Sequence, residues 1–207
     1  MHDAGEAQAP GPDHRRLFEV ASGQGGYFST VQAAACGFSR ASLSYHARRG
    51  RFVRIKRGLY RLAEYPASPR EEVLAAWLAS GKDDAVVSHE SALDILGLSD
   101  IVPERVHLTV PRSRRYRMAG PGVDIHTTNR PLPSTDTVIR DGIRVTSPAR
   151  SIIDAAETGT GPEHVTRAIH QAVERGLATS AQLRAAASGR GPRVERLIAR
   201  ALEEGPR

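Results

Sequence analysis

The chain has 207 residues, enough for one large domain or two small ones. Hydrophobic residues make up 40% of it and charged residues 25%, which is the balance of an ordinary globular protein. No stretch approaches the roughly 18 uninterrupted apolar residues of a membrane span, and the N-terminus lacks the apolar core of a secretory signal. The single cysteine, Cys36, excludes a disulfide scaffold, so we expect a soluble cytoplasmic protein.

The net charge of +6 is concentrated in the first third of the chain. Residues 1–65 carry 10 basic and 5 acidic side chains, whereas residues 66–207 carry 19 and 18. Between Arg40 and Arg61 there are eight Arg or Lys residues and no Asp or Glu. A local excess of this kind predicts a polyanionic partner for one module, and DNA is the polyanion that it favours.

The chain opens with residues 1–12, an Ala-, Gly- and Pro-rich lead-in that we expect to be disordered. A first helix is predicted over residues 13–21, before a glycine-rich break. Ser29 and Gln32 have the spacing of a capping box, so a second helix should open at Ser29 and end at Gly37. Helical spacing predicts that its inward stripe consists of Val31, Ala34 and Ala35.

A third helix is predicted to begin at the cap residue Ser39. Phe38 and Leu43 have the spacing of a hydrophobic staple, which fixes the angle at which the chain enters the helix. Leu43 and Ala47 should face the core, and His46 should pack at its edge. The opposite face is small, polar and basic, as a helix in the major groove requires: Ala41, Ser44, Tyr45 and Arg48, flanked by Ser42 and Arg49.

Residues 52–62 are predicted to form a β-hairpin whose turn includes Gly58. Val53 and Ile55 alternate with Arg54 and Lys56, which predicts one apolar and one cationic face. Helices and hairpin together predict a winged helix-turn-helix over residues 13–65. A solvated basic surface is the alternative interpretation of the same charges.

The candidate DNA-binding residues fall into two groups. Side chains expected at base edges are Ser42, Ser44, Tyr45 and Arg48. Side chains expected at phosphates are Arg40, Arg49, Arg51, Arg54, Lys56 and Arg57. Tyr60 of the hairpin completes the set.

The second module is predicted to cover residues 66–207, after a short proline-containing hinge. Strands are expected at residues 85–87, 106–110, 123–126 and 142–145. Helices are expected at residues 68–79, 90–96, 148–157, 163–175, 180–187 and 192–204. This order predicts an α+β domain in which several helices pack on a small mixed or antiparallel sheet.

A second basic cluster is predicted at the tip of a hairpin in this module. It contains a tyrosine among four arginines: Arg112, Arg114, Arg115 and Arg117. A solvated loop is the simplest interpretation, and a second nucleic-acid contact or a docking site for RNA or protein is the alternative.

Motifs for catalysis are largely missing. His89-Glu90 is followed by Leu93 where a zinc-protease helix needs a second histidine, and no cysteine pair or Gly-x-Ser-x-Gly turn occurs. A metal-dependent nuclease motif needs a lysine after its carboxylates, and no lysine follows Lys82. We therefore expect no metal, no cofactor and no enzymatic activity.

Several of these segments resemble AbiEi-family antitoxins of type IV bacterial toxin–antitoxin systems. In the first module they are residues 26–30 and the run Arg57-Gly58-Leu59-Tyr60-Arg61. In the second module they are residues 88–93, 106–111 and 142–150, and the resemblance spans about residues 15–185. The wing sequence and Thr146-Ser147-Pro148-Ala149-Arg150 are its most specific parts.

The resemblance implies a bacterial transcriptional repressor with two domains. The winged helix would bind repeated operator sequences in double-stranded DNA of its own promoter, as monomers cooperating on DNA or as a dimer. The C-terminal domain would counter a nucleotidyltransferase-like toxin without forming a stable complex. Two alternatives stay open at this point: a nucleic-acid-processing enzyme, or a protein-binding adaptor, with the winged helix used for targeting.

Overall fold

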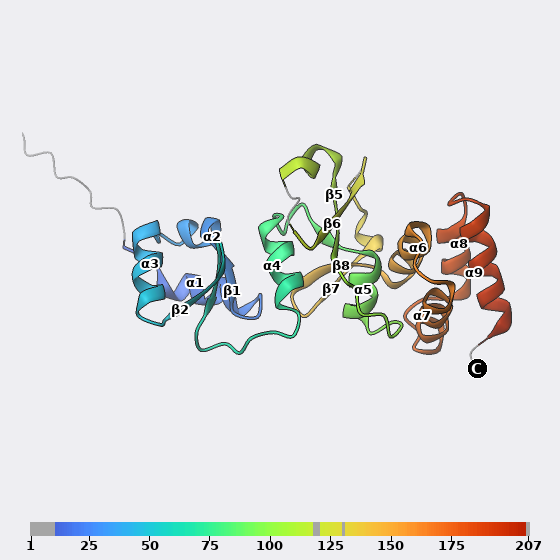
Figure 1. Ribbon diagram of the computed structural model, residues 1–207, viewed down its shortest axis with the longest axis horizontal. Coiled ribbons are helices and arrows are strands. Elements are labelled where there is room, and N and C mark those ends of the chain that lie inside the picture. Colours follow the sequence, from blue (N-terminus) through green and yellow to red (C-terminus); the bar gives the residue numbers. More distant parts are fainter. Residues whose placement is uncertain (1–10, 118–120, 130, 206–207) are drawn as a thin grey trace, which may run out of the picture. The chain divides into compact units, whose positions relative to one another are not determined.

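The computed structural model describes residues 11–117, 121–129 and 131–205 (Figure 1). Residues 1–10, most of the expected lead-in, lie outside this description. The chain forms two compact units that divide between Ala79 and Ser80. Each unit is described separately below.

The N-terminal unit is a winged helix-turn-helix built on a three-stranded antiparallel sheet of order β1-β3-β2. Its strands are β1 (Tyr27–Ser29), β2 (Phe52–Lys56) and β3 (Leu59–Leu62). Its helices are α1 (His14–Ser22), α2 (Thr30–Ala35), α3 (Arg40–Arg48) and α4 (Glu71–Ala79). The helices, caps and hairpin agree with the sequence prediction, whereas β1 was not anticipated.

Aromatic side chains form the core that holds α3 against this sheet. The ring of Phe28 lies 5.0 Å from that of Phe52 and stacks on that of Tyr60, with 5.9 Å between centroids. Leu17 and Leu43 close the core from α1 and α3 and are almost fully buried. Burying one side chain of this size contributes about 1.5–3 kcal/mol, so the position of α3 is firmly set.

The inward face of α2 differs from the prediction. Val31 is 77% exposed and Ala34 and Ala35 are also exposed, while Ala33 and Cys36 are buried. The helix has only six residues and mostly small side chains, so helical spacing alone does not distinguish its faces.

The faces of the hairpin also differ from the prediction. Phe52, Tyr60 and Leu62 are buried, whereas Val53 is 38% exposed. Strand β2 shifts register between Arg54 and Lys56, and Arg54 pairs directly with Tyr60 of β3. Arg54 therefore shares the face of the sheet that carries the aromatic core, which a simple alternation of apolar and charged residues did not reveal.

Helix α4 belongs to the N-terminal unit, although the sequence placed it in the second module. It packs on β1 and β3. The hydroxyl of Tyr27 donates a 2.7 Å hydrogen bond to Glu71 of α4 and accepts a 3.2 Å bond from the backbone N–H of Ser68. The compact unit therefore extends to Ala79, beyond the boundary expected near residue 66.

The C-terminal unit contains a mixed five-stranded sheet of order β6-β5-β4-β8-β7. Its strands are β4 (Val86–Val87), β5 (Val106–Pro111), β6 (Val123–Thr128), β7 (Thr137–Arg140) and β8 (Ile143–Thr146). Neighbours β4–β5 and β7–β8 are antiparallel, while β4–β8 and β5–β6 are parallel. The α+β class is confirmed, and β7 was not anticipated.

Five α-helices complete the part of this unit that the structure describes: α5 (His89–Leu96), α6 (Pro148–Thr158), α7 (Pro162–Glu174), α8 (Ser180–Ala187) and α9 (Pro192–Glu204). Helix α5 packs on β5, β8 and α6, and α6 to α9 pack against one another beside the sheet (Figure 1). Among the described residues, no helix is both long and apolar enough to cross a bilayer.

Candidate nucleic-acid interface

Helix α3 is capped at its N-terminus and packed along one side. The Ser39 hydroxyl accepts a 3.0 Å hydrogen bond from the backbone N–H of Ser42, which caps the helix. Phe38 and Leu43 are buried below the first turn, as the staple spacing predicted. His46 is only 7% exposed, and burial, reinforced by the nearby His14 and Arg51, lowers its pKa, so this ring is a neutral core group.

The outer face of α3 presents an aromatic ring together with cations. Tyr45 is 48% exposed. The guanidinium carbon of Arg49 lies 5.5 Å from the centre of the Tyr45 ring, a cation–π contact that limits the motion of both side chains. Ser44 and Arg48 are exposed beside them, and Ser42 is half-buried. The predicted surface of the helix is therefore present, with Arg49 directed to Tyr45.

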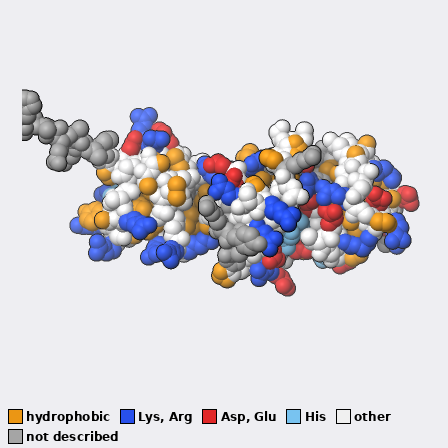
Figure 2. Space-filling view, turned by 90° about the horizontal axis from the view of Figure 1, so that it is seen from above, with side chains coloured by type: hydrophobic (Ala, Val, Ile, Leu, Met, Phe, Trp, Pro, Cys, Tyr) orange, Lys and Arg blue, Asp and Glu red, His pale blue; other side chains and the backbone are white. Residues whose placement is uncertain are grey.

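Six arginines on and around α3 and the hairpin form no ion pair with an acidic side chain that the structure describes. Among the described residues, no ion pair joins an Asp or Glu to any of Arg40, Arg48, Arg49, Arg51, Arg54 or Arg57. Figure 2 shows Lys and Arg side chains gathered along one border of the N-terminal unit. Unpaired guanidinium groups keep their full charge available to an external anion.

Arg61, from the same wing sequence, has a different role. Its Nε lies 3.9 Å from Glu71, one of its terminal nitrogens donates to the carbonyl of Tyr65, and its guanidinium lies 5.9 Å from the ring of Tyr27. Arg61 therefore fastens β3 to α4.

Five of the predicted residues meet around one cavity of about 300 Å³ between α3 and the hairpin. They are Arg40, Ser44, Arg54, Arg57 and Tyr60. Thr30 also lines the cavity and was missed by the sequence prediction. Its backbone N–H donates a 2.9 Å hydrogen bond to the carbonyl of Gly58 in the hairpin turn, a contact with no signal in local spacing.

The second basic cluster does not lie at a hairpin tip. Residues Arg112–Arg117 form a 3₁₀ helix, and the strands that they connect, β5 and β6, run parallel. Arg114 lies 3.2 Å from Asp84, which reduces the charge that the cluster presents, while Arg112 and Arg115 are exposed. The side chain of Arg117 lies outside the described residues. A second nucleic-acid contact here stays an untested prediction.

Three histidines stack in the C-terminal unit. The ring centres of His89 and His126 are 3.5 Å apart, and Nδ1 of His107 lies 3.0 Å from Nε2 of His126. Burial lowers the pKa of all three and brings that of His89 to about 2, so the cluster is neutral. In the described part of the chain, no group of three or more His, Cys, Asp or Glu residues is placed to hold a metal ion.

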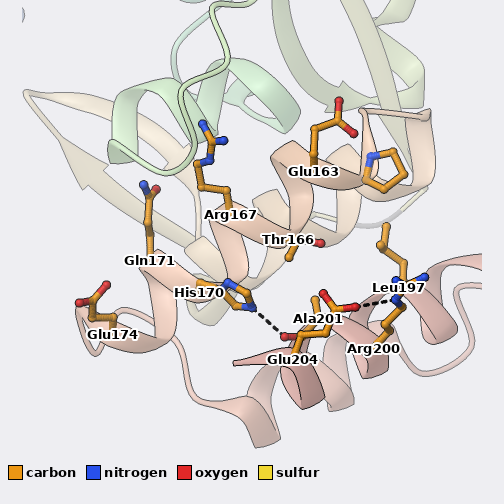
Figure 3. A pocket seen from close by; sticks show the side chains of 11 residues that line it. Glu163, Thr166, Arg167, His170, Gln171, Glu174, Leu197, Arg200, Ala201 and Glu204 are labelled. Atoms are coloured by element: carbon orange, nitrogen blue, oxygen red, sulfur yellow. Dashed lines mark hydrogen bonds and ion pairs between the residues drawn. The ribbon is translucent and has the colours of Figure 1, made fainter. Parts of the chain in front are cut away.

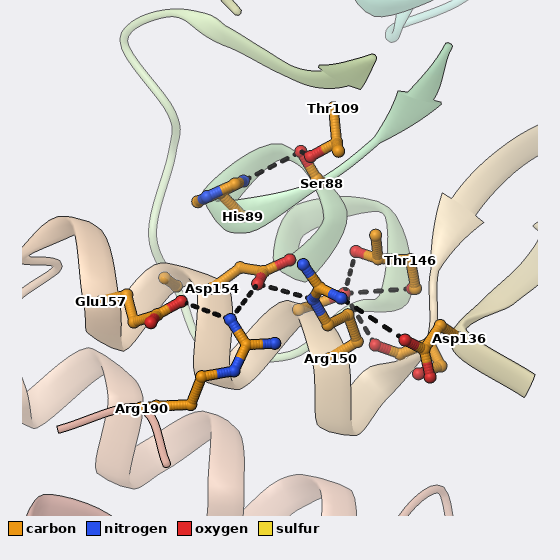
Figure 4. Close-up of polar contacts among 12 residues, drawn as sticks. Ser88, His89, Thr109, Asp136, Thr146, Arg150, Asp154, Glu157 and Arg190 are labelled. Carbon is orange, nitrogen blue, oxygen red and sulfur yellow. Dashed lines mark hydrogen bonds and ion pairs between the residues drawn. The ribbon is translucent and has the colours of Figure 1, made fainter. Parts of the chain in front are cut away.

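A polar network joins β8 to α6 (Figure 4). Arg150 donates a 2.6 Å hydrogen bond to Asp154 and lies 3.4 Å from Asp136. Hydroxyls of Thr146 and Ser151 lie 2.7 Å apart. Asp154 is 2% exposed, and burial raises its pKa although Arg150 opposes the effect. Side chains of the segment 146–150 therefore make structural contacts inside this unit.

A groove of about 740 Å³ runs between α7 and α9 (Figure 3). His170 Nε2 lies 2.8 Å from the carbonyl of Ala201 across it, and Arg200 pairs with Glu204 at 2.6 Å. Its lining mixes acidic and basic side chains, so it lacks the uniform positive charge that a nucleic-acid backbone requires.

The comparisons agree with the geometry of the N-terminal unit. Residues 15–63, from α1 to the end of β3, match the family described as "Transcriptional regulator, AbiEi antitoxin". The match confirms the family resemblance over these residues. No curated protein matches the chain.

A solved structure has a similar fold over almost the whole chain. It is the RV2827C protein from Mycobacterium tuberculosis, which is 18% identical, with a TM-score of 0.59. The match covers 95% of this chain and 80% of that one. At this identity the similarity concerns the fold alone.

Proposed function

We propose that the N-terminal unit binds double-stranded DNA in a sequence-specific manner and that the chain represses its own operon. The family match over residues 15–63 supports a regulator. The observation that carries the proposal is a set of arginines on and around α3 and the hairpin that form no ion pair with any described Asp or Glu: Arg40, Arg48, Arg49, Arg51, Arg54 and Arg57. Such a surface neutralises phosphates and releases counterions, which is the main source of affinity for DNA.

In this proposal one group of side chains contacts bases and a second group contacts phosphates. Arg48, Tyr45 and Ser44, with Ser42, approach base edges in the major groove, because small and planar side chains fit there beside the helix backbone. Arg40, Arg49, Arg51, Arg54, Lys56 and Arg57 bind phosphates and set the register, with Tyr60 behind them.

The full chain, in this proposal, is the antitoxin of a type IV system. The C-terminal unit counteracts a nucleotidyltransferase-like toxin without forming a stable complex, and no cofactor takes part. The operator consists of repeated sites in the promoter of its own operon, which monomers occupy cooperatively. This part rests on the family description and on the resemblance of the second module.

Binding to the upstream promoter, measured by electrophoretic mobility shift, tests the DNA-binding proposal. We expect the wild-type chain to shift the promoter duplex well before a scrambled duplex of equal length. Arg48→Ala should reduce that preference, whereas Arg200→Ala, an exposed arginine on α9, should not. Equal shifts of both duplexes by the wild-type chain would refute sequence-specific binding.

The antitoxin part has a separate test. Co-expression with the nucleotidyltransferase-like product of the neighbouring gene should restore growth that this toxin alone arrests. Failure to restore growth, with both proteins present at comparable levels, would refute the antitoxin role and leave the DNA-binding proposal intact.

A further inference from the structure

The cavity between α3 and the hairpin is lined almost entirely by hydrogen-bond donors. Three guanidinium groups, from Arg40, Arg54 and Arg57, contribute to its wall. Leu43 supplies apolar surface, and the lining contains no Asp or Glu. Hydroxyls come from Thr30, Ser44 and Tyr60. Together these groups suit an anion with several acceptor oxygens.

These donors are not used inside the unit. Among the described residues, no hydrogen bond or ion pair occupies the side chains of Arg40, Arg54 or Arg57, and none occupies the hydroxyls of Thr30 or Ser44. Polar groups on a folded surface usually bind water, but three guanidinium groups in one concave site repel one another. That repulsion is relieved when an anion binds between them.

Tyr60 is the most informative member of the lining. Its residue is only 7% exposed, and its ring is fixed by stacking on Phe28. The hydroxyl has no hydrogen-bond partner among the described residues. Because the hydroxyl is not among the buried side-chain atoms that lack a partner, it reaches the solvent of the cavity. A fixed ring with a free hydroxyl in the wall can donate to an anion without losing an internal hydrogen bond.

The hairpin side of the cavity is held in place before any ligand arrives. Gly58 takes a φ of +83° in the turn, and its carbonyl accepts the backbone N–H of Thr30 at 2.9 Å. Arg54 lies directly across the strands from Tyr60. The donors therefore converge without a large rearrangement of the backbone, which reduces the entropy lost on binding.

We infer that this cavity seats one phosphate group of the DNA backbone, next to the bases that α3 contacts. The inference rests on the proposed function and makes it more specific. Ser44 then binds the phosphate, and base contacts fall to Tyr45 and Arg48 further along α3. One phosphate, held from three elements, fixes the register of the helix in the groove.

Removing one hydroxyl tests whether the cavity binds a phosphate. Tyr60→Phe keeps the buried ring and should weaken binding to every duplex about tenfold, the size expected for a hydrogen bond to a charged acceptor. Tyr65→Phe is the matched control, because its hydroxyl bonds to Ser22 at 2.6 Å inside the unit. Unfolding curves confirm that both variants fold.

Neutral methylphosphonate linkages, placed one at a time along the duplex, locate the phosphate. In the wild-type chain the phosphate in the cavity should cost about tenfold in affinity when it is neutralised, and the phosphates bound by Arg51 and Lys56 should also cost affinity. In Tyr60→Phe only the loss at the cavity position should become smaller, because the two changes remove a shared interaction. Equal losses at all positions, or losses that are unchanged in Tyr60→Phe at every position, would overturn the phosphate site even if the chain binds DNA.

A titration with inorganic pyrophosphate separates this inference from the proposed function. Side-chain Nε signals of Arg54 and Arg57 should shift saturably in the wild-type chain and less in Tyr60→Phe. If the chain bound pyrophosphate in this way but failed to bind any duplex, the cavity would belong to a small phosphorylated ligand and the DNA seat would be wrong. Absence of any shift would remove the anion site altogether.

Discussion

Neutralising Arg51, which directly precedes the hairpin, should reduce the salt dependence of DNA binding by a defined step. Of the six cations assigned to phosphates, Arg49 is engaged by Tyr45. Among the other five, all exposed, Arg40, Arg54 and Arg57 share the phosphate in the cavity, while Arg51 and Lys56 each neutralise one more. Each neutralised phosphate contributes a slope of about −0.9 to log K against log salt concentration, so three predict about −2.7. Arg51→Gln should then give about −1.8.

These slopes correspond to large differences in affinity. Between 50 and 200 mM salt, a slope of about −2.7 reduces the association constant by about 40-fold, and a slope of about −1.8 reduces it by about 12-fold. Fluorescence anisotropy with one labelled duplex at several salt concentrations resolves the two. Because both slopes come from the same duplex, differences in base contacts cancel.

Arg200→Gln is the matched control for this experiment. It removes the same charge from the chain, but from an exposed side chain of α9 that pairs with Glu204. Its slope should equal that of the wild-type chain. A flat wild-type slope, or equal slopes for Arg51→Gln and Arg200→Gln, would show that the basic surface of α3 and the hairpin does not bind phosphates.

Three further predictions concern specificity and stability. Arg48→Ala should reduce the preference for the operator by about 1–3 kcal/mol, whereas Lys56→Ala should weaken all duplexes equally; competition binding that showed the reverse would exchange their roles. Gly26→Ala should lower the free energy of unfolding by about 1–3 kcal/mol in thermal unfolding, because Gly26 has a φ of +89° and the added methyl group would lie 2.4 Å from another side chain. The loss should be larger than in Gly50→Ala, where the added methyl group meets open space. Burial lowers the pKa of His89 to about 2, so below pH 6.5 the unfolded chain binds the proton that the folded chain excludes. The contribution of His89 to stability is full above that pH and should fall by about 2 kcal/mol at pH 5 in urea unfolding, so the loss in His89→Gln should be smaller by about that amount.

Helix ends were predictable from the sequence because their causes are local. Ser29 with Gln32, and Ser39 alone, form the expected caps, since a side chain and the N–H that it accepts lie three residues apart. Helices α8 and α9 also have the predicted bounds: α8 opens with a capping box of Thr179 and Gln182, and α9 opens at Pro192. The outer face of α3 also followed from spacing, because Leu43 fixes which side is inward.

Contacts between distant segments were not predictable in this way. Strand β1 has only three residues and depends on pairing with β3, and the parallel pairing of β5 with β6 is set by the whole sheet. The place of α4 depends on the bond between Tyr27 and Glu71, 44 residues apart. Thr30 and Tyr60 meet in the cavity through the same kind of long-range contact. Residue spacing therefore indicates which arginines are basic surface residues, but it does not indicate that they converge on one cavity.

The order of the N-terminal sheet has a consequence for any experiment that removes its charges. Strand β2 is an outer strand, with one side of its backbone unpaired within the sheet and with Val53 exposed on its surface. Charged side chains on such a strand discourage a second chain from adding to the sheet. Arg54 and Lys56 therefore help to keep the protein from self-associating, in addition to providing positive charge for DNA. Variants that neutralise both should be checked for self-association before a loss of DNA binding is interpreted.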